Sequence, residues 1–138
     1  MFISNDEMLD MVFYYKKINK WKYVIYNEKE FEKKELSDEE ISKYNKLILE
    51  CTVLDFGLSN SLHMDSMVEG SDGFKEFNAK FYNENKLLRV IKGWNAKDKD
   101  GKPIPITLEN IRNLAPEIGN KIIKDYDNLH WNEEQEKN

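Results

Sequence analysis

Cysteine, proline and glycine are scarce in this chain, and each scarcity removes a class of fold. The single cysteine, Cys51, excludes an intrachain disulfide, so a reducing compartment fits best. Six glycines and three prolines occur in 138 residues, about half of an average usage of roughly 12 %. This scarcity disfavours an all-β fold with many tight turns and favours helix.

Long apolar runs and an excess of basic residues are also absent. No apolar stretch approaches the roughly 18 residues that span a bilayer. Asp6, Glu7 and Asp10 stand where a secretory signal peptide carries Lys or Arg. With 26 acidic and 21 basic residues the net charge is -5, so the chain gains nothing from the counterion release that drives nucleic-acid binding. We expect a cytoplasmic protein whose partners include neither a membrane nor a nucleic acid.

The composition that is present predicts a folded chain. Apolar residues make up 40% and aromatic residues 12% of the sequence, which a disordered chain does not have. The length suits one domain, and we expect a single globular domain over residues 1–131 with a frayed, polar C-terminal tail over 132–138. The predicted fold class is mainly α (α+β): a small helical domain with an N-terminal β-hairpin.

Two aromatic and β-branched clusters near the N-terminus predict that hairpin. They cover residues 9–15 and 21–26, and the polar residues 16–20 between them suit a turn. A helix from Asn5 to Lys17, with Asn5 as its cap, is the competing interpretation, because periodicity over so short a run does not separate the two.

Helical spacing of apolar residues predicts two longer helices in the middle of the chain. Ser37 and Glu40 form a capping-box pattern, and the apolar residues that follow predict a helix over about 38–56 that stops at Gly57. A second helix is predicted over about 73–92, with Gly93 as its C-cap. Residues 57–71 between them are expected to form a loop or a short helix and to be the most mobile segment.

The C-terminal third begins with a turn. Gly101 supplies a positive φ and Pro103 blocks helix continuation. Thr107 is the predicted N-cap of a short helix that reaches about Leu114, and Pro116 suits the first turn of a final helix. The predicted buried stripe of that helix is Ile118, Ile122, Ile123, Tyr126 and Leu129.

Motifs that carry catalysis or bind metals are not found in the sequence. It contains no Gly-rich phosphate loop and no Gly-x-Ser-x-Gly. His63, His130 and Cys51 lack the close pairings of metal ligands, and Cys51 is expected to be a buried structural thiol. The stretch from Asp98 to Gly101 begins like a calcium loop, but Lys102 occupies the third ligand position, so we expect a solvated turn. We therefore expect no enzyme, no cofactor, no metal and no catalytic residue.

A distinctive order of elements occupies residues 87–123. A helix ends in Val90–Asn95 with its Gly-Trp pair, Asp98–Thr107 forms a charged Asp-Gly-Lys-Pro turn with a Pro-x-Thr helix entry, and 109–118 opens the short final helices. This stretch resembles the C-terminal part of the small tail assembly chaperones of long-tailed bacteriophages. The N-terminal part is similar in outline, as a hairpin followed by a capped helix.

The resemblance implies a non-enzymatic function. Such chaperones bind the long, helical, hydrophobic tape-measure protein, keep it soluble, help to recruit tail-tube protein, and are absent from the finished virion. The resemblance is also compatible with self-association of the chain. The candidate partner-binding residues are exposed apolar or aromatic side chains: Trp94, Ile104, Ile106, Trp21 and Tyr23. The alternative for Trp94 is a core position that closes the turn onto the helices.

Two other functions remain open at this point. A small phage or prophage protein that inhibits a host (defence) system by occluding a binding surface would have the same small size, acidic charge and lack of catalytic motifs. A virion connector protein would instead form stable rings of defined symmetry.

Overall fold

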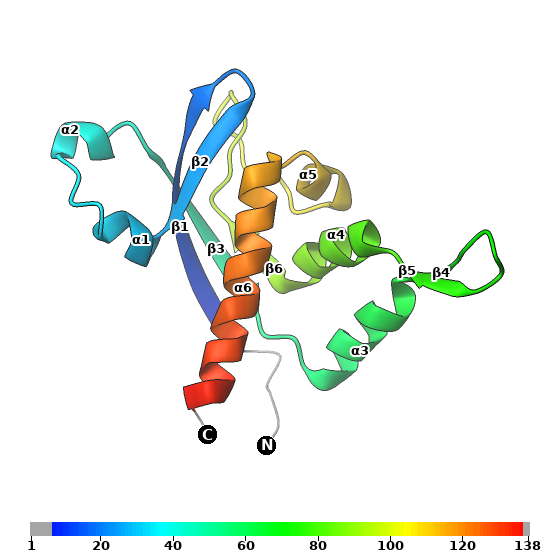
Figure 1. Cartoon of the computed structure of the whole chain (residues 1–138). Coiled ribbons are helices and arrows are strands. Elements are labelled where there is room, and N and C mark those ends of the chain that lie inside the picture. The colour runs from blue at the N-terminus through cyan, green and yellow to red at the C-terminus, as the bar shows by residue number, and fades with distance from the viewer. Residues whose placement is uncertain (1–6, 137–138) are drawn as a thin grey trace. The chain divides into compact units, whose positions relative to one another are not determined.

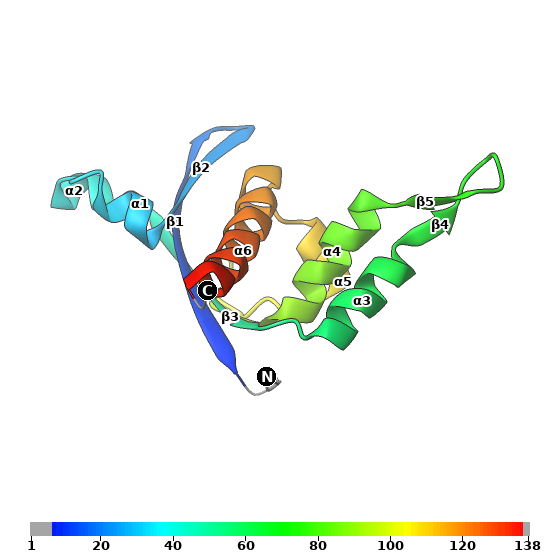
Figure 2. The same cartoon turned by 60° about the horizontal axis from the view of Figure 1, so that its bottom comes forward.

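The computed structural model describes residues 7–136, with side chains up to Leu129 (Figure 1, Figure 2). In chain order the elements are β1 (Met8–Asn19), β2 (Lys22–Asn27), α1 (Glu28–Glu32), α2 (Asp38–Ile41), β3 (Asn45–Thr52), α3 (Phe56–Asp65), β4 (Met67–Glu69), β5 (Lys75–Phe77), α4 (Ala79–Val90), β6 (Ile91–Trp94), α5 (Leu108–Arg112) and α6 (Pro116–Glu136). They form two compact units. Of the described residues, unit 1 contains 7–10 and 49–112, and unit 2 contains 11–48 and 113–136.

The prediction of a mainly helical fold is wrong. The structure is α+β, with a four-stranded antiparallel sheet of order β2-β1-β3-β6 and a two-stranded antiparallel sheet of β4 and β5. The error comes from two segments in which apolar residues recur at spacings that helices and strands both satisfy, since short apolar runs do not reveal their period.

The predicted N-terminal hairpin is confirmed. β1 and β2 pair antiparallel, with Tyr14 opposite Tyr26 and Lys17 opposite Tyr23, and the register shifts by a bulge just before the turn. The competing helix is wrong over its described part, and Asn5, its supposed cap, lies outside the described residues. Aromatic and β-branched side chains suit a pleated, half-buried surface, which is why composition decides this case correctly.

The helix predicted over 38–56 begins where expected but ends after four residues. Ser37 caps α2 by accepting a hydrogen bond from the Glu40 amide, and α2 ends at Ile41. The following residues form β3, in which Leu47, Leu49 and Cys51 are buried in alternation. This period of two marks a strand with one buried face, and strand pairing overrides the capping signal beyond the first turn.

The helix predicted over 73–92 is shorter at its start. α4 begins at Ala79, where the Asn78 side chain accepts a hydrogen bond from the Phe81 amide at 3.0 Å. Residues 75–77 pair with 67–69 instead, so Phe74 and Phe77 do not belong to a helical stripe. Gly93 is not a C-cap, because it lies within β6. In the preceding segment the short-helix alternative is confirmed, as α3, and Gly57 lies inside that helix.

The C-terminal predictions are largely confirmed. The Asp98 carboxylate accepts hydrogen bonds from the amides of Asp100 and Lys102, and Gly101 has a φ of 79°. The Thr107 hydroxyl accepts from the Asn110 amide at the start of α5. α6 continues to Glu136, into the stretch for which a frayed tail is predicted, and the last two residues lie outside the described part.

Unit 2 packs α6 against β2. Three residues of the predicted stripe, Ile118, Ile122 and Tyr126, are buried, whereas Leu129 is 36% exposed. Phe13 on β1 is only 1% exposed. Burial of this kind contributes about 1.5–3 kcal/mol for a large apolar side chain, so α6 stabilises unit 2 chiefly through this stripe.

Polar contacts fix α6 to the start of α1. The Asn27 side-chain amide donates to the Asp125 carboxylate at 2.9 Å, and Lys121 lies 2.6 Å from Glu30. Partial burial alone would lower the pKa of Lys121, but its hydrogen bond to Glu30 and the charge of Asp125 raise it. Partial burial would raise the pKa of Glu30, but the hydrogen bond to Lys121 lowers it. Both groups are therefore held in their charged forms.

Unit 1 is built around α3, α4 and α5. Leu62 of α3 and Val90 of α4 are fully buried, and Ile111 of α5 is 4% exposed. α4 contacts both neighbouring helices, so it is the central helix of this unit. The β4–β5 hairpin projects beyond α3 and α4 (Figure 1, Figure 2).

Candidate partner-binding surfaces

One segment of unit 1 exposes an unusual number of large apolar side chains. We call residues 55–77, which contain α3, β4 and β5, the acidic arm. Its exposed large apolar residues, with exposed fractions, are Phe56 87%, Leu58 38%, Met64 59%, Val68 41%, Phe74 74% and Phe77 45%. Exposed apolar surface of this extent marks an interaction site more often than scattered single residues do.

The acidic arm also carries most of the net negative charge of the chain. Five acidic residues and one lysine give this segment a formal net charge of −4, of a total of -5 for the chain. The acidic residues are Asp55, Asp65, Glu69, Asp72 and Glu76. An apolar surface bordered by one sign of charge selects partners that carry apolar groups next to the opposite charge.

α3 is capped at both ends and presents most of its apolar side chains outward. The Asp55 carboxylate caps the helix by accepting from the Leu58 amide at 2.8 Å. At the other end the buried Ser66 hydroxyl donates to the Leu62 carbonyl at 2.6 Å. Leu62 is the only buried residue that the helix contributes among the described side chains, so its remaining apolar residues face outward.

Glycine residues shape the turn between β4 and β5. Gly73 has a φ of 82°, which L-residues rarely adopt. A Cβ atom at Gly70 would lie 2.6 Å from the Glu76 carboxyl group, the far end of a flexible side chain, so a larger residue there would displace the Glu76 side chain. The Asp72 carboxylate accepts from the Phe74 amide at 3.1 Å. These features order the backbone of the turn next to Phe74, which is 74% exposed.

Aromatic contacts join the acidic arm to α4. The His63 and Phe77 rings stack with centroids 5.3 Å apart, and Phe77 lies 5.2 Å from Tyr82 of α4. Arg89 of α4 pairs with Asp65 at 3.1 Å. These contacts place the base of the arm on α4, while Phe56 and Phe74 remain exposed.

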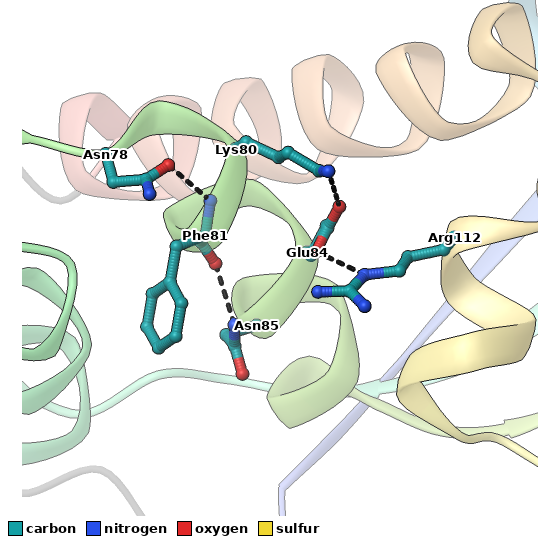
Figure 3. A network of polar contacts seen from close by, with 6 residues as sticks. All are labelled: Asn78, Lys80, Phe81, Glu84, Asn85 and Arg112. Atoms are coloured by element: carbon teal, nitrogen blue, oxygen red, sulfur yellow. Dashed lines mark hydrogen bonds and ion pairs between the residues drawn. The ribbon is translucent and has the colours of Figure 1, made fainter.

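α4 is itself held by the polar network in Figure 3. The Glu84 carboxylate accepts from Arg112 of α5 at 2.8 Å and lies 4.0 Å from Lys80. The Asn85 side chain donates to the Phe81 carbonyl at 2.9 Å. The network satisfies the polar groups of two helices and positions the helix that carries the arm.

Unit 2 contains a cluster of aromatic rings covered by lysines. Tyr14 stacks on Phe31 at 4.1 Å, and Phe31 meets Tyr44 edge-on at 4.9 Å. Lys16 lies over Tyr44 at 4.9 Å and Lys34 lies over Tyr26 at 4.1 Å. These are cation–π distances, so the lysines of this cluster pack onto its rings.

The end of the β1–β2 hairpin, residues 17–22, is exposed throughout. We call it the hairpin tip. Trp21 is 83% exposed and Ile18 51%. The Asn19 side chain accepts from the Trp21 amide at 2.9 Å, which orders the turn. Lys17, Lys20 and Lys22 make the tip strongly basic.

The residues predicted from the sequence to bind a partner lie in both units. In unit 1, Trp94 is half-buried on β6, and its indole N–H donates to the Ile104 carbonyl. Ile106 is half-buried nearby in sequence. The alternative prediction for Trp94, a position that closes the turn onto the helices, requires a contact of this kind. In unit 2, Trp21 belongs to the hairpin tip and Tyr23 lies under Lys17. Their contact with a partner remains a prediction.

Sequence reasoning did not select the acidic arm. The helix predicted over 73–92 contains Phe74 and Phe77, the helix predicted over 38–56 ends at Phe56, and Met64 lies in the segment predicted as a loop or short helix. The available signal is the clustering of acidic residues among the apolar residues of 55–77. Apolar side chains next to one sign of charge are typical of a surface that meets a partner of opposite charge.

The described residues contain no group of three or more His, Cys, Asp or Glu side chains that could hold a metal ion. His63 contributes a ring contact instead, and the His130 side chain lies outside the described part. Within the described residues, no helix has both the length and the apolar content that a bilayer crossing requires.

Cys51 provides a direct test of burial in unit 1. Burial, aided by the charge of Asp10, raises the pKa of its thiol to about 12. The thiolate is the reactive form, so at about pH 8 we expect a thiol reagent to label the native chain about a thousandfold more slowly than the urea-unfolded chain. Similar labelling rates in the two states would contradict the buried position.

Comparisons with protein-family models, with curated proteins and with solved structures found no match.

Proposed function

We propose that this chain is a non-enzymatic tail assembly chaperone that acts in the bacterial cytoplasm, binding the tape-measure protein of a long-tailed phage and keeping it soluble. The observation that carries the proposal is the acidic arm, which exposes six large apolar side chains and holds most of the chain's net charge. The resemblance of residues 87–123 supplies the identity of the partner.

The physical logic follows from the partner's properties. A long apolar helix aggregates through its exposed seam unless that seam is covered. The exposed rings of Phe56 and Phe74 supply apolar surface of the kind that would cover such a seam. The acidic residues beside them favour helices with flanking Lys or Arg, and their charge keeps the complex in solution. The tail-tube protein is the second partner that the resemblance implies.

Co-expression tests this proposal. We expect the tape-measure protein of the same genome to be insoluble alone, and to become soluble and co-elute in size-exclusion chromatography when this chain is present. A tape-measure protein that stays insoluble while this chain elutes alone contradicts the chaperone function. Capture of a defined host defence complex in that case would favour the inhibitor function.

A further inference from the structure

Two exposed segments of this chain carry opposite charge. Residues 11–27 contain four lysines and no acidic residue, and three of those lysines lie in the hairpin tip. The acidic arm carries a formal net charge of −4. Eight of the eleven exposed large apolar side chains among the described residues lie on these two segments. The chain thus carries two exposed apolar segments whose charges are complementary.

We propose that the hairpin tip of one copy docks on the acidic arm of a second copy. The apolar centre of this contact is Trp21, 83% exposed and ordered by the Asn19 turn. A rigid aromatic anchor with low conformational entropy is the residue type that dominates protein interfaces. On the arm, Phe74 and Phe56 offer apolar area of matching kind.

Charge complementarity argues for a second copy rather than an unrelated partner at the hairpin tip. Lys17, Lys20 and Lys22 flank Ile18 and Trp21 just as acidic residues flank the phenylalanines of the arm. Opposite charges around an apolar centre steer association and fix its register. Because the two surfaces differ, the contact is heterologous, and repeated contacts give closed rings or open chains.

The contact also protects the arm while no partner is bound. An exposed apolar surface is an aggregation liability, and a reversible cover removes it. This proposal does not rest on the chaperone function, since it concerns the purified chain alone. If both hold, the tape-measure protein competes with the hairpin tip for the arm.

Analytical ultracentrifugation of the full chain tests the proposal. We expect the mass to rise with protein concentration at about 0.05 M NaCl, and the apparent Kd to weaken by about tenfold or more at about 0.5 M NaCl, where charges are screened. Lys20→Glu with Lys22→Glu is expected to weaken self-association by about tenfold or more, as is Glu69→Lys with Glu76→Lys.

Mixing the two variants gives the sharpest outcome. The first retains an intact arm and the second an intact hairpin tip, so together they form one native contact. At a concentration at which each variant alone is monomeric, we expect the mixture to form a complex of the two variants. The matched control, Lys97→Glu with Lys99→Glu, changes the net charge as the first variant does, at exposed positions elsewhere, and should associate like the parent.

Two results would overturn the proposal. One is a parent chain that stays monomeric at every concentration. The other is association that persists in both variants, because it would then use another surface. Formation of the mixed complex also shows that both variants are folded, so a loss of association in either one is not a loss of structure.

Discussion

Replacing Phe13 with alanine is expected to lower the free energy of unfolding by about 3–5 kcal/mol. Phe13 is 1% exposed on β1, opposite Asn27 of β2. Truncation removes the transfer free energy of the ring and leaves a cavity that the surrounding strands fill only in part. Because domains of this size are stable by about 5–15 kcal/mol, the loss should be plain in a urea titration followed by circular dichroism.

The same strand provides the control. Ile18 also lies on β1 but is 51% exposed, and Ile18→Ala should change the unfolding free energy by no more than about 0.5 kcal/mol. A Phe13→Ala variant that loses less than about 1 kcal/mol would contradict the packing of unit 2 described above.

Replacing Phe56 and Phe74 with serine is expected to abolish solubilisation of the tape-measure protein. Each ring is more than two-thirds exposed in the free chain, and burial of one such ring on binding contributes about 1.5–3 kcal/mol. Loss of both should weaken binding by about a hundredfold or more. The soluble fraction of the co-expressed tape-measure protein, measured on a gel, reports the effect.

Exposed apolar residues outside the acidic arm provide a matched control. Met8 is 48% exposed and Ile41 40%, so Met8→Ser with Ile41→Ser removes a similar kind of surface elsewhere. We expect this control to solubilise the partner like the parent chain. Both double variants should retain the parent's unfolding midpoint. An arm variant that solubilises the partner normally would remove the acidic arm from the proposed function.

Local signals in the sequence were reliable where a short-range cause decides the structure. The Asp98–Lys102 turn, the Thr107 cap and the α6 stripe all depend on neighbours within a few residues. The β1–β2 hairpin was predicted from composition for the same reason. These elements follow from turn chemistry and side-chain shape.

The sequence misled where distant pairing decides. Ser37 starts a helix as predicted, but β3 pairs antiparallel with β6 from Leu49 onward. Residues 75–77 likewise pair with β4 instead of extending α4. Register between strands depends on contacts that one sequence does not reveal.

The expected exposure of the candidate binding residues is likewise found for some residues and not for others. Trp21 was selected as an exposed aromatic residue of the hairpin and is 83% exposed. Trp94 is also predicted to be an exposed side chain, but it is half-buried and its indole donates a hydrogen bond within unit 1. The acidic arm is not predicted because its residues fall in three separate expectations: the end of one helix, a loop or short helix over 57–71, and the start of a helix over 73–92 that in the structure begins only at Ala79.

The shortness of β4 and β5 has a consequence for fibril formation. Each strand has three residues, whereas the cross-β spine of an amyloid is built from segments of about six or seven. Glu69, Lys75 and Glu76 occupy half of the six paired positions, and such gatekeeper charges oppose stacking of identical strands. The arm can therefore display aromatic rings to a partner's side chains while its backbone gives a growing fibril too little edge to extend.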